Sequence, residues 1–307
     1  MSHRIMELCL GHDPNRPLMA LTTLLFPGWF TRRLYADYVD DFAWPAGKKT
    51  WFNLSFDLDL PEDIEAMPWL LDTLAPYPFR ASFACIGQWI ERAPDVHRRI
   101  IDEGHEVLNH TYSHPHSEVF NPRRLVDMSF DEQRAEVERG HAVCVELLGY
   151  TPVGFRLPHL EFTPNIYPIL RDLGYQYSSS ALMRRDKKLV PFQTREGLWE
   201  LPLNQCPRHP SSVFDTYHAF RSPSKLFKVW REDDAGFFAS FRRLIDLGVQ
   251  TGAYVNVYFD PVDVRGLASF RQMLDYLVAR RDEVGMGTYS ELLAVVSREA
   301  AQGVRVA

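Results

Sequence analysis

The sequence predicts an α/β fold in which parallel strands and helices alternate to form a βα barrel. From about residue 50, short β-branched or aromatic runs alternate with longer segments whose apolar residues recur three and four positions apart, which is the pattern of βα units. Seven strands separated by helices predict a closed or nearly closed barrel. We expect the strands at Trp51–Leu58, Arg80–Gly87, His105–Asn109, Val153–Leu157, Gln176–Ser180, Leu198–Pro202 and Ala253–Phe259.

The helices between these strands are assigned from the spacing of their apolar residues and from the glycines that follow them. Four segments end at Gly104, Gly149, Gly174 and Gly248. Glycine is favoured after a helix because it adopts the left-handed backbone conformation without strain. We expect helices at Asp63–Leu74, Asp95–Asp102, Ser129–Leu148, Asn165–Asp172, Phe237–Leu247 and Leu267–Arg280.

Two regions do not follow this alternation and define the domain organisation. Residues 1–48 are aromatic and rich in proline, and we expect an N-terminal extension that acts as a lid or as a contact between subunits of a homo-oligomer. Residues 49–300 are expected to form the barrel, with an insertion around 206–234 that packs over its mouth. Residues 18–35 also fit a membrane-surface anchor, although their interrupted pattern favours a packed lid.

Composition and charge exclude several classes of function. The 307 residues carry 34 Lys and Arg against 40 Asp and Glu, a net charge of −6, and 46% are apolar. A large core is therefore expected, and a nucleic-acid partner is not. No apolar stretch reaches the roughly 20 residues that span a bilayer, and the first residues lack a secretory pattern, so the expected location is the cytoplasm. The four cysteines are too few and too dispersed for a disulfide framework, which predicts buried thiols.

Polar residues that could bind a metal or act as acids and bases lie at the C-terminal ends of three expected strands. This is the end of a βα barrel that carries the catalytic residues. In the segment SFDLD, Asp57 and Asp59 lie two positions apart and point to the same side of an extended chain. Two carboxylates this close repel each other unless a cation or a shared proton neutralises them. A strand-end turn or a helix cap is the alternative role.

The other two groups supply imidazoles and a guanidinium. In NHTYSHPH, His110 and His114 are four positions apart, a spacing that brings two imidazoles onto one cation, and His116 follows them. With an aspartate from a neighbouring strand they would form a His₂Asp site that leaves positions open for water and substrate. In GFRLPH, Arg156 ends a strand, where it is suited either to hold a carboxylate through two hydrogen bonds or to form a surface ion pair.

These motifs resemble, in order and spacing, those of the NodB-like polysaccharide deacetylases of carbohydrate esterase family 4. SFDLD resembles the first motif, HTYSH the H-[ST]-x-x-H motif and GFRLPHLEFTP the R-x-P motif. The flanking segments are similar to the branch that contains peptidoglycan deacetylases and allantoinase-like cyclic-amide hydrolases. The resemblance covers about residues 50–205 and 250–296, and residues 1–48 have no counterpart.

The resemblance implies a distorted (β/α) barrel of the NodB-homology type with one divalent metal ion, most often Zn²⁺. Its ligands would be Asp59, His110 and His114. Asp57 would be the general base that takes a proton from the attacking water, and Arg156 the residue that orients this base. A backbone N–H after Asp59 is expected to help stabilise the oxyanion that forms when water attacks an amide.

The last motif departs from the family pattern. The related branch has Tyr-Phe-His-Pro, whereas this chain has Asp260 in place of the histidine that would protonate the leaving amine. Three interpretations stay open: Asp260 is an acid with a raised pKa, His159 or His218 replaces the histidine, or Asp260 binds a cationic part of the substrate. An inactive relative is a fourth interpretation.

The sequence thus predicts a metal-dependent amide hydrolase that removes an N-acetyl or N-formyl group from an amino sugar or sugar-containing metabolite inside the cell. The expected partner is a small molecule or glycan that carries the N-acyl group. The alternatives are an allantoinase-like cyclic-amide hydrolase and a carbohydrate-binding pseudoenzyme. The residues expected to contact substrate are His159, Tyr112, His218 and Trp230, with Trp51 and Tyr217 as further aromatic candidates for stacking on sugar rings.

Overall fold

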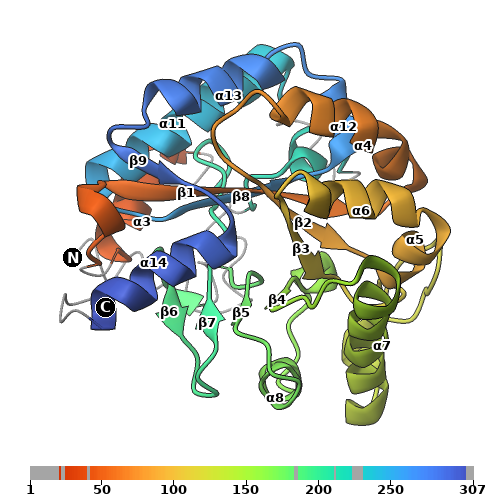
Figure 1. The fold of residues 1–307 in the computed structure, drawn as a ribbon. Coiled ribbons are helices and arrows are strands. Elements are labelled where there is room, and N and C mark those ends of the chain that lie inside the picture. The colour runs from red at the N-terminus through yellow and green to blue at the C-terminus, as the bar shows by residue number, and fades with distance from the viewer. Residues whose placement is uncertain are drawn as a thin grey trace.

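The backbone forms one curled β-sheet with helices packed around its outer side (Figure 1). The structure, a computed structural model, describes residues 21, 25–39, 42–182, 186–210, 212–222 and 231–301. In this part of the chain the strands lie in the order β6-β7-β5-β4-β3-β2-β1-β8, and β9 also pairs with β1. Of the paired strands, β6 and β7 are antiparallel and the others are parallel. The strands are β1 Thr50–Leu58, β2 Ser82–Cys85, β3 Glu106–Asn109, β4 Gly154–Phe155, β5 Tyr177–Ser178, β6 Phe192–Gln193, β7 Trp199–Glu200, β8 Val255–Phe259 and β9 Val284–Met286.

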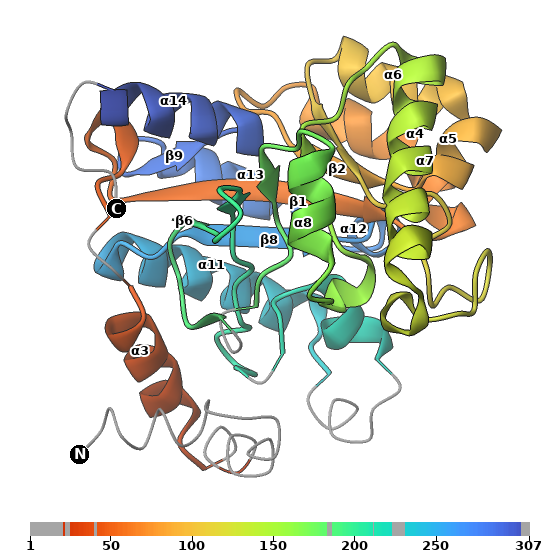
Figure 2. The same cartoon turned by 90° about the horizontal axis from the view of Figure 1, so that it is seen from below.

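Helices cover the outer side of this sheet, and α14 lies on the opposite side of β1 from α3 (Figure 2). Within the described ranges, no helix is long and apolar enough to cross a membrane. The helices are α3 Pro27–Asp37, α4 Pro61–Leu74, α5 Gly87–Arg92, α6 Pro94–Asp102, α7 Phe130–Leu148, α8 Ile166–Asp172, α11 Asp234–Thr251, α12 Pro261–Arg265, α13 Phe270–Ala279 and α14 Tyr289–Ala301.

Alternation along β1 separates the apolar core from a polar barrel interior. All nine residues of β1 are buried, but successive side chains point to opposite faces of a strand. The even-numbered residues Phe52, Leu54, Phe56 and Leu58 join the main apolar core. The odd-numbered residues Asn53, Ser55 and Asp57 make hydrogen bonds instead. The same alternation therefore packs β1 against the core and directs Asp57 into the interior.

The seven expected strands and six expected helices are all present, and the sheet curls into a half-barrel, which agrees with the distorted (β/α) barrel that the resemblance implied. Of the two forms that the strand pattern predicted, a closed or a nearly closed barrel, the closed form is not found. The edges that do not pair belong to β8 and to the β6–β7 hairpin. After β7, Leu201 and Leu203 direct their backbone N–H groups to the β5 side. Pro202 faces the other side and has no N–H to donate. Across this gap, Asn256 Nδ2 donates to the carbonyl of Leu201 at 2.9 Å, and the Asn256 backbone N–H donates to Asn204 Oδ1 at 2.6 Å.

Gly248 does not end a helix, in contrast to the sequence prediction. Helix α11 continues to Thr251 and ends at Gly252, which has a φ of 77°. A Cβ atom at Gly248 would lie 2.5 Å from Val255 Cγ2. Glycine is needed there because α11 packs closely against β8, whereas Gly104, Gly149 and Gly174 have the expected positive φ.

The described part of the N-terminal extension packs on the barrel. Phe30, Leu34 and Tyr35 of α3 are fully buried in the main core. Thr31 donates to the carbonyl of Pro207 at 2.7 Å, which connects α3 to the start of the insertion. Of the segment considered as a membrane anchor, residues 18–20 and 22–24 lie outside the described residues, as does Cys9. The other three cysteines are buried and make no disulfide.

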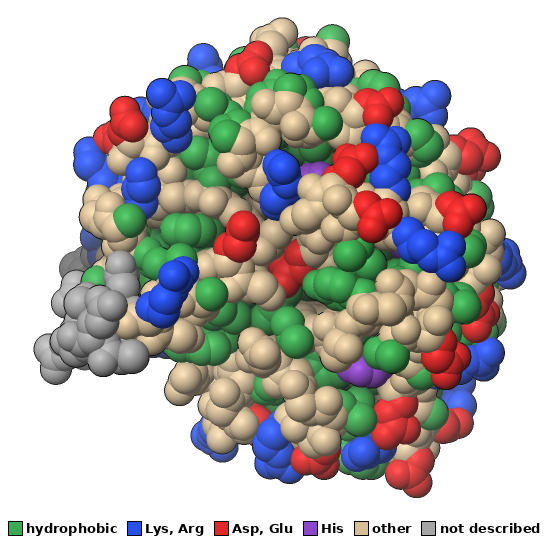
Figure 3. Space-filling view, viewed as in Figure 1, with side chains coloured by type: hydrophobic (Ala, Val, Ile, Leu, Met, Phe, Trp, Pro, Cys, Tyr) green, Lys and Arg blue, Asp and Glu red, His purple; other side chains and the backbone are tan. Residues whose placement is uncertain are grey.

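Charged side chains of both signs are interspersed on the face of the molecule shown in Figure 3. Among the described residues on that face, Lys and Arg do not gather into one patch. This distribution agrees with the small net charge of the chain.

Candidate active site

Three segments bring two imidazoles and one carboxylate to a single point. Asp59 directly follows β1, His110 directly follows β3, and His114 lies in the loop after β3. The carboxyl ends of the parallel strands β1, β2 and β3 meet at one edge of the sheet. His110 Nε2 is 3.3 Å from Asp59 Oδ1, and His114 Nε2 is 3.5 Å from Asp59 Oδ2. The structure therefore brings together the three residues that the sequence singled out as metal ligands.

These side chains have the properties that a metal ion requires. Asp59 Oδ1, His110 Nε2 and His114 Nε2 are buried and have no hydrogen-bond partner within the described part of the chain. His110 donates its Nδ1–H to the carbonyl of Arg156 at 2.8 Å, which leaves the lone pair on Nε2. Burial lowers the pKa of His114 to about 3, so its imidazole is in the neutral form that binds metals. The donor set fits one divalent ion such as zinc.

The loop after β3 holds His114 in a conformation that a regular helix does not provide. Thr111, His114 and His116 have φ values of 65°, 49° and 75°, which residues other than glycine rarely adopt. Ser113 donates its backbone N–H and its hydroxyl to the carboxylate of Glu136 on α7, at 2.9 and 2.8 Å. The His114 N–H donates to Thr111 Oγ1 at 3.1 Å. These bonds offset the backbone strain at this site.

Asp57 lies beside the ligands and is held by Arg156. Arg156 Nη1 donates to Asp57 Oδ1 at 3.0 Å and Oδ2 at 3.3 Å. Its Nη2 is 3.1, 3.2 and 2.8 Å from the hydroxyls of Ser55, Ser179 and Tyr289. Burial raises the pKa of Asp57, and the positive charge of Arg156 opposes that rise. Arg156 is 0% exposed, so the surface ion pair considered for it is wrong.

Tyr289 is an interior residue that the sequence analysis missed. It begins α14, and its Oη lies 2.9 Å from Ser55 Oγ and 2.7 Å from Asn256 Oδ1, in addition to its contact with Arg156. One phenol thus supports the arginine that holds Asp57. No motif indicated it, because the packing of α14 against the sheet decides where Tyr289 points.

The backbone N–H expected to stabilise an oxyanion is already used. The residue after Asp59 is Leu60, and its N–H donates to Asp63 Oδ2 at 2.9 Å. The Asp59 N–H donates to the same oxygen at 3.2 Å. Asp63 therefore stabilises the turn between β1 and α4. The Leu60 N–H is not free to stabilise an oxyanion, in contrast to the sequence prediction.

Asp260 follows β8 at the same edge of the sheet and is paired with an arginine. Arg221 Nη2 donates to Asp260 Oδ2, and Arg221 Nε donates to Asp263 Oδ2 at 2.9 Å. The Asp260 N–H donates to Thr216 Oγ1 at 3.0 Å. A neighbouring guanidinium favours the ionised carboxylate. The ion pair with Arg221 disfavours the protonated form that Asp260 would need as a proton donor. It also neutralises the negative charge that a cationic substrate group would bind. No motif had indicated Arg221 or Thr216.

Of the residues expected to contact substrate, His159 lies beside the ligands. It is exposed, and its ring centroid is 4.6 Å from that of His114. Tyr112 instead faces the surrounding helices. Its hydroxyl donates to Glu91 Oε2 of α5 at 3.0 Å, and the guanidinium of Arg139 on α7 lies 3.5 Å from its ring centroid.

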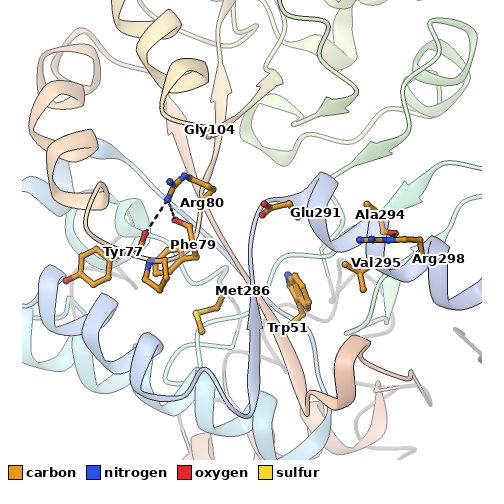
Figure 4. A pocket seen from close by; sticks show the side chains of 11 residues that line it. Trp51, Tyr77, Phe79, Arg80, Gly104, Met286, Glu291, Ala294, Val295 and Arg298 are labelled. Carbon is orange, nitrogen blue, oxygen red and sulfur yellow. Dashed lines mark hydrogen bonds between the residues drawn. The ribbon is translucent and has the colours of Figure 1, made fainter.

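The remaining candidates are not at the ligand set. His218 is buried in a second cluster within the insertion, Tyr217 is exposed next to it, and Trp230 lies outside the described residues. Trp51 is the second residue of β1 and lines a cavity of 750 Å³ beside α14 (Figure 4). This cavity is at the amino end of β1, whereas Asp57 is near its carboxyl end, so Trp51 is not at the candidate active site.

In this half-barrel, two imidazoles and an aspartate converge beside a second aspartate, which is buried and held by an arginine. This arrangement is typical of hydrolases that use a metal ion to activate water. Residues 45–178 match the family model for polysaccharide deacetylase. This part of the chain is therefore similar to the NodB-like polysaccharide deacetylases of carbohydrate esterase family 4.

Similar proteins agree with this family. The chain is 34% identical over 137 residues to a peptidoglycan-N-acetylglucosamine deacetylase of Bacillus cereus, which covers 45% of this chain and 44% of that protein. It is 33% identical over 113 residues to a chitooligosaccharide deacetylase of Bradyrhizobium sp., which covers 37% and 47%. The chain thus spans about half the length of these curated relatives. A crystal structure from Mycobacterium smegmatis, described as a polysaccharide deacetylase, has the same fold, with a TM-score of 0.70 at 22% identity and coverage of 84% and 93%.

Proposed function

We propose that the protein is a metal-dependent N-deacetylase that hydrolyses the acetamide of an N-acetylated amino sugar in a glycan or a sugar-containing metabolite. One observation carries this proposal: the unpaired ligand atoms of Asp59, His110 and His114 converge beside Asp57. The relatives named for peptidoglycan and chitooligosaccharide support an amino sugar as the substrate class.

The roles of the side chains follow from their contacts. A divalent ion held by the three ligands would lower the pKa of water and polarise the acyl carbonyl. Asp57 accepts the proton of the attacking water. Arg156 binds both oxygens of Asp57, so this carboxylate keeps one orientation. His159, exposed beside His114, is our candidate for the contact with the leaving amine because Arg221 holds Asp260 as a carboxylate.

The test compares variants of two aspartates with different proposed roles: Asp57 as the general base and Asp59 as a metal ligand. Protein loaded with Zn²⁺ is incubated with N-acetylglucosamine oligomers from chitin and from peptidoglycan, and released acetate is measured. We expect Asp57→Asn to keep its metal and to lose about 10²- to 10⁴-fold in kcat. Asp59→Asn should lose both the metal and the activity. Zinc-loaded wild-type protein that releases no acetate from any N-acetylated amino sugar would contradict the proposal.

Two other outcomes of this experiment would point to the alternatives. Full activity of metal-free protein on a cyclic amide would support the allantoinase-like hydrolase. Sugar binding without turnover is a second candidate function, and the Asp260–Arg221 pair favours it because the family has a proton-donating histidine at this position. A thermal shift with chitin oligomers and no acetate release would support that function. The cytoplasmic location stays a prediction, which cell fractionation tests.

A further inference from the structure

A second group of metal-binding side chains lies in the insertion, apart from the candidate active site. Cys206, His209 and His218 are buried, and their ligand atoms lie within 4.8 Å of one another. His209 Nδ1 is 3.7 Å from Cys206 Sγ and 3.4 Å from His218 Nε2. Glu232 Oε1 lies 3.7 Å from the same nitrogen. Three side chains of ligand chemistry therefore converge, and the Glu232 carboxylate lies beside one of them, His209.

The distances between these atoms are close to the edges of a zinc tetrahedron. With Zn–S of about 2.3 Å and Zn–N or Zn–O of about 2.0–2.2 Å, tetrahedral angles separate neighbouring ligand atoms by about 3.3–3.6 Å. The three distances to His209 Nδ1 agree with these values to within a few tenths of an ångström.

Glu232 provides an independent sign that a cation belongs here. Its side chain is 1% exposed. Ser240 Oγ donates to Oε1 at 3.1 Å, but Oε2 is buried without a hydrogen-bond partner in the described part of the chain. A buried carboxylate oxygen without a donor is costly, and coordination of a cation removes that cost.

Asp215 gives His218 the orientation of a metal ligand. Asp215 Oδ1 lies 3.5 Å from His218 Nδ1, so the other ring nitrogen, Nε2, faces His209. Carboxylates that contact the outer nitrogen of a histidine ligand are a regular feature of zinc sites. The other oxygen of Asp215 accepts a hydrogen bond from Tyr258 Oη at 3.1 Å.

We propose that Cys206, His209, His218 and Glu232 bind a second divalent ion, chemically best matched by zinc, and that this ion is structural. Four protein ligands fill a tetrahedral coordination sphere and leave no position for water or substrate. The set connects Cys206, at the start of the insertion, with Glu232, two residues before α11 begins at Asp234. From the sequence, His218 of this insertion was considered as a proton donor or a substrate contact, and not as a metal ligand.

The proposed ion would lie next to the segment that contacts Asp260. His218 belongs to the π-helical turn Tyr217–Arg221, whose last residue pairs with Asp260. Thr216, next to that turn, accepts the Asp260 N–H. An ion on His218 would therefore hold in place the segment that positions Asp260 at the candidate active site.

The test uses the whole chain, stripped of metal by a chelator and titrated with Co²⁺. Cobalt bound to a thiolate shows a near-ultraviolet charge-transfer band, and of the two sites only the second contains sulfur. We expect wild type to bind two ions per chain, by elemental analysis, and to show the band. Asp59→Asn should keep the band with one ion, so failure of the deacetylase proposal leaves this test intact.

Two cysteine variants complete the experiment. Cys206→Ala should lose the band and one ion, whereas Cys144→Ala, which removes another buried thiol, should keep both. A wild-type protein saturated with Co²⁺ that shows no thiolate band would overturn the proposal, as would an unchanged ion count in Cys206→Ala. Should Cys206→Ala not fold, the wild-type band and His209→Gln, which should lose one ion, decide the outcome.

Discussion

At the scale of single residues, the candidate active site is marked by polar atoms that the protein itself leaves unpaired. Asp59 Oδ1, His110 Nε2 and His114 Nε2 lack partners in the described ranges, while neighbouring Arg156 makes hydrogen bonds to four side chains. A buried polar group without a partner costs about 1–3 kcal/mol. Three such groups at one point are the atoms that the proposed divalent ion would pair.

The Asp260–Arg221 pair changes what a restored family histidine is expected to do. In Asp260→His alone, the Arg221 guanidinium would face the new imidazole and oppose its protonation, so we expect little gain. Adding Arg221→Gln removes that charge and should raise kcat for acetate release roughly tenfold over the single variant. Steady-state kinetics of both variants, with Arg221→Gln alone as the control, measure this effect. Equal rates for the single and double variants would show that Arg221 does not control the protonation of the side chain at position 260.

Tyr289 is expected to act as a positioning residue for Arg156. Tyr289→Phe leaves Arg156 and Asn256 short of a partner, so the free energy of unfolding should fall by about 1–3 kcal/mol, and kcat should fall with KM unchanged. The matched control is Tyr254→Phe, which removes another buried hydroxyl, bonded to Asn53 and not to Arg156. Chemical denaturation and acetate release follow both variants. A loss of kcat as large in the control would refute the positioning role.

At the scale of elements, the strand and helix pattern was predictable where segments are long. Strand β1 and helices α4, α7 and α13 carry a clear periodicity of two or of three and four. Strands β6 and β9 have two and three residues, too few to show any period, and both were missed. Hydrogen bonding to a neighbouring strand, which no local sequence pattern encodes, defines such short elements.

Close packing of α7 on the segment that carries His110 gives an element-scale prediction. A Cβ atom at Gly140 would lie 2.4 Å from Asn109 Oδ1 and 2.9 Å from the Thr111 carbonyl carbon. Gly140→Ala should therefore lower the free energy of unfolding by about 1–3 kcal/mol and weaken metal binding, because Asn109 and Thr111 flank His110. Denaturant unfolding and metal titration measure the two effects.

The control for this prediction is Gly248→Ala. It crowds α11 against Val255 of β8, so it should lower stability without a change in metal affinity. Metal affinities that are equal in the two variants would contradict the proposed link between α7 and His110.

At the scale of the whole molecule, buried histidines outside both proposed metal sites predict a loss of stability in acid. Burial lowers the pKa of His97 and of His105 to about 4. His105 Nδ1 accepts the Ala81 N–H at 3.0 Å, a bond that only an unprotonated nitrogen makes. The unfolded chain takes up these protons near pH 6.5, so it binds more protons than the folded chain between about pH 6.5 and 4. The free energy of unfolding should therefore decrease as the pH falls through this range.

Urea unfolding at several pH values tests this prediction. His105→Gln keeps a hydrogen-bond acceptor but cannot be protonated, so its stability should depend less on pH between about 6.5 and 4. An unchanged pH dependence in both His105→Gln and His97→Gln would show that other groups cause the loss.

The motif residues of the candidate site were predictable because each lies near the end of a strand that the pattern located or in the loop after it, and the carboxyl ends of parallel strands meet at one edge. Asp57, Asp59, His110, His114 and Arg156 are of this kind. Tyr112 and His218 were misjudged because the direction of a loop side chain depends on what packs beside it. Arg221 and Glu232 had no motif, and only the fold of the insertion brings them to their partners.

By itself, the sequence determined the α/β class, the similarity to polysaccharide deacetylases and the residues whose chemistry a metal site requires, because periodicity and short motifs are local properties of a chain. Only the tertiary structure decided that the sheet stays open beside Pro202 and that Arg221 neutralises Asp260. It also decided that Cys206 lies beside His209 and His218, with Glu232 next to His209. These outcomes depend on contacts between segments distant along the chain, and such contacts are selected by packing and burial rather than by the order of neighbouring residues.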